Sequence, residues 1–304
     1  MQKIALILGA SGKIGRNARA AFEAAGWRVR CFDRARDDMV QAARGADVIV
    51  NGLNPPKYHD WARLIPAITR DVIAAAKASG ATVIVPGNVY NLDDRGGVWS
   101  ESTPHRPTTK KGRIREEMER AYEASGVRTI VLRAGSFIEP NGTDDVMALL
   151  LLREIRKHKV FVGGDPNALH AYCYLPDWAR AAVALAERRL ELAVFEDVPF
   201  EGHAFTAEHV RTFLSAELGR PLAFSHMPWW VMTALSPFWE MAREMLEMRY
   251  LWSLSHSLSG EKLARLLPDF RATPLEEVLR RSLPADVRSA TPAAEFVKAR
   301  AHGA

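Results

Sequence analysis

Residues 3–16, with the sequence KIALILGASGKIGR, constrain the fold of this chain more than any other segment. Five consecutive apolar residues, Ile4–Leu8, predict a strand that is buried on both faces, as in the middle of a parallel sheet. A turn with glycine at every third position, Gly9, Gly12 and Gly15, follows the strand. Apolar residues at helical spacing come next and end before another glycine, which is typical of a helix C-terminus. The segment therefore predicts a strand, a glycine turn and a helix, which together begin a βαβ unit.

The glycine turn predicts a binding site for the diphosphate of a dinucleotide. In such a turn the first glycine permits a tight bend, the second lets the backbone approach the diphosphate, and the third lets the helix pack closely against the strand. The free N–H groups at the start of the helix attract the anion. Glycine triplets also arise by chance, so the flanking strand and helix carry much of this prediction. The residues expected to contact the cofactor here are Gly9, Ser11, Gly12, Lys13, Ile14 and Gly15.

A second strand, residues 28–33, ends in an acidic residue that bears on the choice of cofactor. Asp33 follows Gly15 by close to the ~20 residues at which a carboxylate binds the adenosine ribose hydroxyls. A carboxylate repels a 2′-phosphate and so favours NAD, but Arg34 comes next and an arginine can hold that phosphate. The expected cofactor is therefore NAD or NADP, with NAD favoured. The alternative is that Asp33 is simply a charged strand end that faces solvent.

Strands alternate with helices from residue 3 to about residue 140. Further strands are expected at residues 46–50, 81–86 and 129–134, and helices at Trp61–Ser79 and residues 113–125. This alternation predicts an α/β fold with a Rossmann-like, doubly wound parallel sheet. The strand at 46–50 runs into a proline-containing loop, and such loops at carboxyl strand ends bind ligands in these sheets. In that loop we expect Gly52 and Leu53 to contact the cofactor and Asn54 to contact the substrate.

The second half of the chain is less regular. Residues 144–158 predict a helix and residues 161–165 a strand that runs into a turn. A helix is expected to start near Asp177, another is expected at 207–218 with Thr206 as its N-cap, and a short strand at 222–227. We expect an NAD(P)-binding domain at 1–165, a mainly helical and partly interleaved substrate region at 166–284, and a surface tail at 285–304.

Composition limits the classes of protein to which the chain can belong. The 304 residues are 48% hydrophobic and 25% charged, which is ordinary for a soluble protein with a sizeable core. No run reaches the ~20 apolar residues of a membrane span, and the first residues begin a strand rather than a secretory signal. Cys31 and Cys173 lie in apolar runs and are expected to be reduced packing residues of a cytoplasmic protein.

The formal charge of +5 mildly favours anionic ligands. Basic residues are scattered among acidic ones, which argues against a nucleic-acid partner, and no cluster has metal-ligand spacing. Residues 227–252 are rich in tryptophan and methionine. We expect this segment to form core or a subunit contact, as in a homodimer, while a pocket wall and interfacial membrane contact are the alternatives.

Several motifs follow one another in an order typical of one protein family. They are the glycine turn, Asp33, ADVIVNGL, Val89-Tyr90, Glu101 with Pro104 and Pro107, LRAGSFIEP, YLPDWARA and TPLEEVL. In this order they resemble the short-chain dehydrogenase/reductase superfamily, in its extended or atypical branch, the NAD-dependent epimerase/dehydratase type. The resemblance runs from residue 3 to about residue 280. It implies an oxidoreductase or epimerase/dehydratase that exchanges hydride between nicotinamide and an oxygen-bearing carbon of a small polar substrate, such as a sugar or a keto or hydroxy acid.

Three residues depart from the family pattern where its chemistry is carried out. Relatives have a serine or threonine at the position of Pro86, a tyrosine at that of Lys111 and a lysine at that of Arg115. Lys111 and Arg115 lie at i and i+4 and would project from one helix face. Three interpretations stay open: Lys111 as acid/base with Arg115 on the nicotinamide ribose, the two as an anion clamp, or a solvated face with pairs such as Arg115–Glu119.

Two residues of the loop at 87–91 are further candidates. The phenol of Tyr90 could donate to a substrate carbonyl in place of the missing tyrosine, and Asn88 could replace the missing hydroxyl as a substrate contact. His105, His158 and His170 have no sequence context for catalysis and are expected at the surface. Because the family residues are replaced, a catalytically reduced NAD(P)-binding sensor is the alternative to an enzyme.

Overall fold

The structure is a computed structural model of the chain, and it describes residues 2–289. Its centre is a sheet of six parallel strands in the order β10-β6-β4-β3-β1-β2. The strands are β1 (Ile4–Leu8), β2 (Arg28–Phe32), β3 (Val48–Asn51), β4 (Thr82–Gly87), β6 (Thr129–Arg133) and β10 (Phe195–Pro199). The chain winds outward in both directions from β1, so the gap between β1 and β3 is the topological switch point. The predicted doubly wound α/β fold is confirmed.

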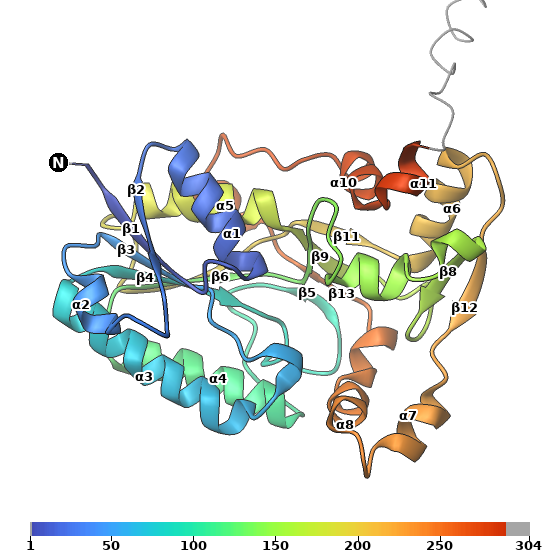
Figure 1. Ribbon diagram of the computed structural model, residues 1–304, viewed down its shortest axis with the longest axis horizontal. Coiled ribbons are helices and arrows are strands. Elements are labelled where there is room, and N and C mark those ends of the chain that lie inside the picture. The colour runs from blue at the N-terminus through green and yellow to red at the C-terminus, as the bar shows by residue number, and fades with distance from the viewer. Residues whose placement is uncertain (1, 290–304) are drawn as a thin grey trace, which may run out of the picture.

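Helices cover both faces of this sheet (Figure 1). On one face lie α1 (Lys13–Ala24) and α5 (Leu175–Glu187), and on the other α2 (Met39–Ala43), α3 (Trp61–Ser79) and α4 (Lys110–Ala124). The alternation of side chains along β1 shows the two cores, because Ala5 and Ile7 pack under α1 and α5 whereas Leu6 and Leu8 pack under α3 and α4. Both faces of β1 are buried, as its unbroken apolar run predicts.

The rest of the chain forms a smaller region beside the carboxyl ends of the main strands (Figure 1). Three small sheets have the orders β11-β9-β7, β12-β8 and β13-β5. Their strands are β5 (Gly97–Trp99), β7 (Ser136–Ile138), β8 (Lys159–Val162), β9 (His170–Tyr174), β11 (His203–Phe205), β12 (Ala223–His226) and β13 (His256–Leu258). The helices are α6 (Ala207–Glu217), α7 (Trp229–Leu235), α8 (Glu240–Glu247), α10 (Leu275–Ser282) and α11 (Ala285–Ser289), whereas α9 (Glu261–Leu266) packs back against β10 and the core of the main sheet.

Several sequence-based expectations differ from the structure. Residues 144–158 do not form one helix but a π-turn at Met147–Leu151 and a 3₁₀ turn at Ile155–Lys157. Cys31 is exposed because β2 is an edge strand, whereas Cys173 is buried as expected. The strand β10 was not foreseen and returns the chain from the C-terminal region to the main sheet.

The C-terminal segments bear on two further expectations. Residues 285–289 of the expected surface tail form α11, and Val287 packs into the core of the C-terminal region, while residues 290–304 lie outside the described part. Of residues 227–252, Met227 and Met248 are buried, but Trp230 and Phe238 are 76% and 91% exposed, so the core interpretation is wrong for those two side chains. Within residues 2–289, no helix combines the length and apolar character that crossing a membrane requires.

Candidate active site at the carboxyl edge of the sheet

The turn between β1 and α1 leaves no room for a side chain at two of its glycines. Gly9 has a φ of +70°, a conformation that residues with a Cβ rarely adopt. A Cβ on Gly15 would lie 2.1 Å from the carbonyl oxygen of Gly9, so α1 starts in direct backbone contact with the turn. A Cβ on Gly12 would meet only that oxygen, at 3.3 Å. The open space beside Gly12 is therefore where a diphosphate has room to approach the N–H groups of the helix start.

The end of β3 packs against this turn. A Cβ on Gly52 would lie 2.8 Å from the carbonyl oxygen of Leu8, and one on Gly9 would lie 2.9 Å from the carbonyl oxygen of Gly52. The structure thus brings Gly52 and Leu53 beside the glycine turn, at the switch point of the sheet. Their contact with a cofactor stays a prediction.

The first turn of α1 is tied to the loop that follows β7. The Lys13 ammonium donates to the backbone oxygen of Asp144 at 2.6 Å, and Arg16 Nε donates to Glu139 Oε1 at 2.6 Å. Ion pairs with Asp144 and Glu139 accompany these bonds. Lys13 therefore faces this loop, which runs beside the proposed diphosphate position.

Asp33 lies just after β2, exposed and next to the glycine turn because β2 pairs with β1. Its carboxylate accepts a hydrogen bond from the backbone N–H of Ala35 at 2.9 Å, and Arg36 Nε lies 3.5 Å from it. Arg34 is also exposed. The placement agrees with both interpretations of Asp33, a ribose contact and a solvent-facing strand end.

Lys111 is buried at the start of α4, with 2% of its side chain exposed. Its Nζ forms ion pairs with the carboxylates of Glu244 and Glu247 on α8, the latter at 2.7 Å, and lies 3.4 Å from the backbone oxygen of Glu244. Glu247 also accepts the backbone N–H of Lys111 at 2.8 Å. Because an ammonium has three donors, Lys111 directs all of them toward α8.

Arg115 is a buried cation with one unused donor, its Nε. Its Nη2 donates to Asn54 Oδ1 at 2.7 Å, and its guanidinium stacks over the Trp61 ring at 4.5 Å. Its Nε is buried without a hydrogen-bond partner, and no ion pair between residues 2–289 includes Arg115. Burial lowers the pKa of this guanidinium. A buried donor without an acceptor is rare, and such a group is suited to hold a ligand oxygen.

These environments decide against one of the three interpretations of Lys111 and Arg115. The solvated-face interpretation is wrong, because both side chains are buried. The expected Arg115–Glu119 pair does not form either, since Glu119 binds Arg133. The acid/base and anion-clamp interpretations stay predictions.

The loop after β4 places Tyr90 beside a second phenol. The hydroxyl groups of Tyr90 and Tyr58 lie 3.3 Å apart, and both side chains are half-buried. Asn88 shapes this loop, because its Oδ1 accepts the backbone N–H of Tyr90 at 3.0 Å and its carbonyl oxygen accepts Arg133 Nη1 at 2.6 Å. The chain thus gathers Asn54, Asn88, Tyr90 and Arg115 at one edge of the sheet.

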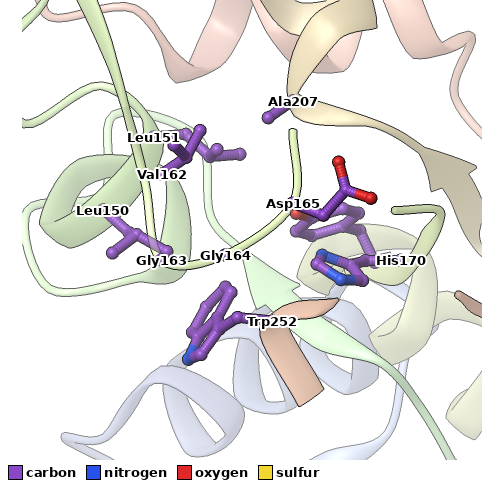
Figure 2. A pocket seen from close by; sticks show the side chains of 10 residues that line it. Leu150, Leu151, Val162, Gly163, Gly164, Asp165, His170, Ala207 and Trp252 are labelled. Carbon is purple, nitrogen blue, oxygen red and sulfur yellow. The ribbon is translucent and has the colours of Figure 1, made fainter. Parts of the chain in front are cut away.

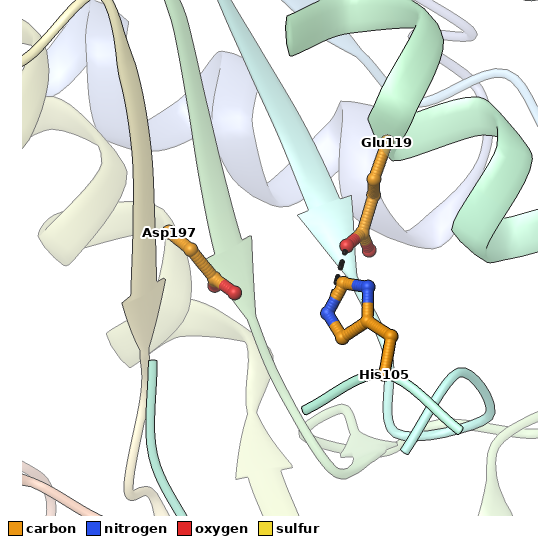
Figure 3. Close-up of side chains that lie close together, drawn as sticks. All are labelled: His105, Glu119 and Asp197. Atoms are coloured by element: carbon orange, nitrogen blue, oxygen red, sulfur yellow. Dashed lines mark ion pairs between the residues drawn. The ribbon is translucent and has the colours of Figure 1, made fainter. Parts of the chain in front are cut away.

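Arg133, at the end of β6, is the centre of a buried charge network. Its guanidinium binds Glu119 at 2.7 Å and Asp197 at 2.8 Å, and 1% of its side chain is exposed. Burial lowers the pKa of Arg133, but the two carboxylates outweigh it and raise that pKa. Figure 3 shows both carboxylates with His105, a grouping that could in principle hold a metal ion. The guanidinium of Arg133 already supplies the positive charge between them.

Sequence reasoning missed Tyr58, Arg133 and the two glutamates of α8. Arg133 carried a signal, because it is the one charged residue in the apolar run TIVLRA. Glu247 carried none, since it lies 136 residues from Lys111 in the sequence. Tyr58 was hidden in a proline-containing loop whose path the sequence does not fix.

A second buried site surrounds His170, in the C-terminal region (Figure 2). Trp252 packs onto Gly163 and Gly164, and the remaining cavity is only about 10 Å³, room for at most one water molecule. The His170 ring meets Trp252 edge to face at 5.9 Å and tilts against His256 at 5.3 Å. The expectation that His170 lies at the surface is therefore wrong, because β9 carries it into the core.

The burial of His170 predicts a loss of stability in acid. Burial, with a contribution from His256, lowers the pKa of His170 from 6.5 to about 4. The unfolded chain therefore binds this proton first, so stability is complete above the unfolded pKa and is lost as the pH falls toward 4. Between pH 7 and pH 5 the loss is about 2 kcal/mol.

Urea unfolding at both pH values checks this prediction. His170→Phe keeps the ring contacts and should lose about 2 kcal/mol less than the wild type between pH 7 and pH 5. His158→Gln, at an exposed position, is the control and should follow the wild type. Equal losses in the wild type and in His170→Phe would contradict the assignment.

Comparisons with known proteins find structures of similar fold but no match by sequence. No protein-family model matches the chain, and no curated protein matches its sequence. Among solved structures, MoeE5 in complex with UDP-glucose and NAD has a TM-score of 0.72 at 17% identity, covering 95% of this chain and 100% of that one. The chain shares the fold of this NAD-bound structure.

Two solved structures of epimerases have the same fold. UDP-glucuronic acid 4-epimerase from Bacillus cereus, in complex with UDP-glucuronic acid and NAD, has a TM-score of 0.70 at 14% identity and covers 92% of this chain and 97% of that one. A nucleoside-diphosphate-sugar epimerase from Staphylococcus aureus has a TM-score of 0.67 at 16% identity, with coverages of 92% and 99%. The fold that the family resemblance implies is thus confirmed.

Proposed function

We propose that this chain binds NAD at the carboxyl edge of β1, β2 and β3, and that it acts as an oxidoreductase or epimerase/dehydratase on a small polar, sugar-like substrate. The observation that carries the proposal is the glycine turn, where Gly9 and Gly15 permit close backbone packing and the space beside Gly12 stays open at a helix start. This turn lies at the switch point of the sheet, where dinucleotides bind in such folds. The structures of similar fold that hold NAD support the choice of cofactor.

The residues present fit a bound dinucleotide. The helix start at Gly12–Ile14 would hold the diphosphate, Gly52 and Leu53 would border it, and Asp33 would bind the adenosine ribose, which favours NAD over NADP. Arg115, with its unpartnered Nε, would hold the nicotinamide ribose hydroxyls or an anionic group of the substrate. When bound, NAD would supply the hydride chemistry at its nicotinamide ring.

The side chains around that position divide the remaining tasks. Tyr90 is a phenol in reach of a substrate oxygen at this edge and takes the acid/base role. Asn54 and Asn88 position polar groups of the substrate. Lys111 holds α8 over the site through Glu244 and Glu247, since its three donors are committed there.

Calorimetry tests whether the chain binds NAD, on which the proposed function depends. We expect the wild-type chain to bind NAD and Gly12→Ala to bind it at least 100-fold more weakly, because the added methyl group occupies the space beside the helix start. Gly12 has a φ of −76° and a ψ of 168°, which alanine adopts readily, so thermal unfolding should change little. Gly26→Asn, beyond the C-terminal end of α1 and away from the turn, is the control, because asparagine tolerates the φ of +79° found there better than alanine does. Absence of NAD binding in the wild type would overturn the proposal.

A cofactor-binding sensor is the second candidate, and the environment of Lys111 favours it. The side chain at the family tyrosine position is closed off by two carboxylates of α8, so NAD binding could change how α8 packs without turnover. NADH mixed with sugar aldehydes and keto acids distinguishes the two, because only an enzyme would change the nicotinamide absorbance.

We infer a cytoplasmic protein, and we place the contact of the expected homodimer at the exposed side chains of α7 and of the turn between α7 and α8.

A further inference from the structure

We infer that Tyr58 is the hydrogen-bond donor that stabilises the phenolate of Tyr90, so that a pair of phenols replaces the single family tyrosine. This inference rests on the proposed hydride-transfer function. It assigns a role to a residue of the β3–α3 loop that no motif marks. Tyr58 acts through Tyr90 and is therefore a positioning residue rather than a catalytic one.

The two phenols come together from the loops that follow two different strands. Tyr58 closes η1 (Pro56–Tyr58), in the connection after β3, and Tyr90 lies in the loop after β4. Their hydroxyl oxygens are 3.3 Å apart, and the Tyr58 ring meets the Trp61 ring edge to face at 5.1 Å. Trp61 is buried and also supports the guanidinium of Arg115. One indole thus fixes both Tyr58 and Arg115.

The backbone of this loop is held in an uncommon conformation. Lys57, Tyr58 and Asp60 have φ values of 55°, 63° and 46°, all in the left-handed region and none of them glycine. Such conformations cost free energy and persist where the surrounding structure imposes them, often at functional sites. Here the loop conformation accompanies a Tyr58 ring that lies against Trp61 and directs its hydroxyl to Tyr90.

The charges around the pair assign Tyr58 as the donor of this hydrogen bond. The ionised form of Tyr90 and burial raise the pKa of Tyr58 well above its usual range, Glu244 adds to this, and Arg115 opposes it. The Lys111 ammonium lies 5.0 Å from the centre of the Tyr58 ring. Tyr58 therefore keeps its proton when Tyr90 has lost its own, and it can donate a hydrogen bond to the Tyr90 phenolate.

Tyr250, a third phenol near the pair, is less suited to donate a hydrogen bond to Tyr90. Burial, Tyr90, Asp94 and Glu247 raise the pKa of Tyr250 to about 12. No hydrogen bond between the described residues joins Tyr250 to Tyr90, whereas one joins Tyr58 to it.

The proton transfer at this pair balances. As a carbonyl substrate is reduced, the Tyr90 Oη–H bond breaks and an O–H bond forms on the substrate oxygen. Tyr58 keeps its own proton and donates a hydrogen bond to the Tyr90 phenolate, and Tyr90, whose side chain is half-buried, regains a proton from solvent. Oxidation of an alcohol runs the same proton steps in reverse.

The experiment measures coupling between the phenols directly. Tyrosinate absorbance is followed during an alkaline titration of wild type, Tyr58→Phe, Tyr90→Phe and, as a remote buried control, Tyr172→Phe. Removing a donor from a phenolate disfavours the charged form. In Tyr58→Phe the ionisation step that Tyr90→Phe abolishes should therefore move to higher pH by about one unit. Tyr172→Phe should leave that step in place.

The outcomes separate this inference from the proposed function. An unmoved Tyr90 step in Tyr58→Phe overturns this inference, even if the chain binds NAD. Failure of the wild type to bind NAD in calorimetry overturns the proposed function, while the titration still measures whether the phenols are coupled. If Tyr58→Phe does not fold, wild-type chain labelled with 3-fluorotyrosine serves instead. Coupled phenols then show two fluorine resonances that both shift at each of two ionisation steps, and independent shifts overturn this inference.

Discussion

Replacing Arg133 by methionine is expected to lower the free energy of unfolding by about 3–5 kcal/mol, the largest effect of any single change considered. The substitution keeps an unbranched chain of similar length but removes the guanidinium that binds both Glu119 and Asp197. Glu119, with 2% of its side chain exposed, would then be a buried charge without its counter-ion. Urea unfolding measures the loss. The dependence of the unfolding free energy on urea concentration should stay unchanged, because the variant changes stability and not the surface exposed on unfolding.

A second substitution tests this explanation of the Arg133 effect. Adding Glu119→Gln to Arg133→Met removes the stranded charge and should recover part of the lost stability. Arg34→Met, at an exposed position, is the control and should change stability by about 0.5 kcal/mol or less. A loss below about 1 kcal/mol in Arg133→Met would show that the network contributes little.

Gly15→Ala is expected to destabilise the chain by roughly 3 kcal/mol and to abolish NAD binding. The added Cβ would lie 2.1 Å from the carbonyl oxygen of Gly9 and 2.6 Å from the Cα of Ala10, and both of these are backbone atoms. Since backbone cannot rotate aside as a flexible side chain can, α1 must shift away from β1. Thermal unfolding measures the loss.

Gly12→Ala is the matched comparison for Gly15→Ala, because its Cβ would meet one atom only, at 3.3 Å. The two variants should therefore separate the roles of the glycines, with Gly12→Ala losing the cofactor and keeping its stability. If Gly15→Ala unfolds at the wild-type temperature, the close contact between α1 and the turn is not a constraint on this fold.

Local sequence patterns predicted the first half of the fold well. The bounds of β1 and α3 agree with the expected ranges, and Thr206 caps α6 by accepting the backbone N–H of His209. These features depend on neighbours within one strand or one helical turn, which a sequence displays directly. The irregular turns at 147–157 were misjudged because apolar spacing alone does not distinguish an α-helix from such turns.

Patterns predicted the candidate site only in part. The glycine turn, Gly52 and Tyr90 lie together at the expected edge of the sheet, because the carboxyl ends of parallel strands meet there. The burial of Lys111 and His170 was not predicted. Their environments come from α8 and from Trp252, which lie far along the chain from them.

By itself, the sequence determined most strands and helices of the first half of the chain and where a backbone without side chains is needed. Short-range sterics and the period of apolar residues decide both, so each can be read from a window of a few residues. Only the tertiary structure decided what each buried charge faces. Glu247 meets Lys111 across 136 residues and Asp197 meets Arg133 across 64, and which carboxylate reaches which cation depends on how distant elements pack.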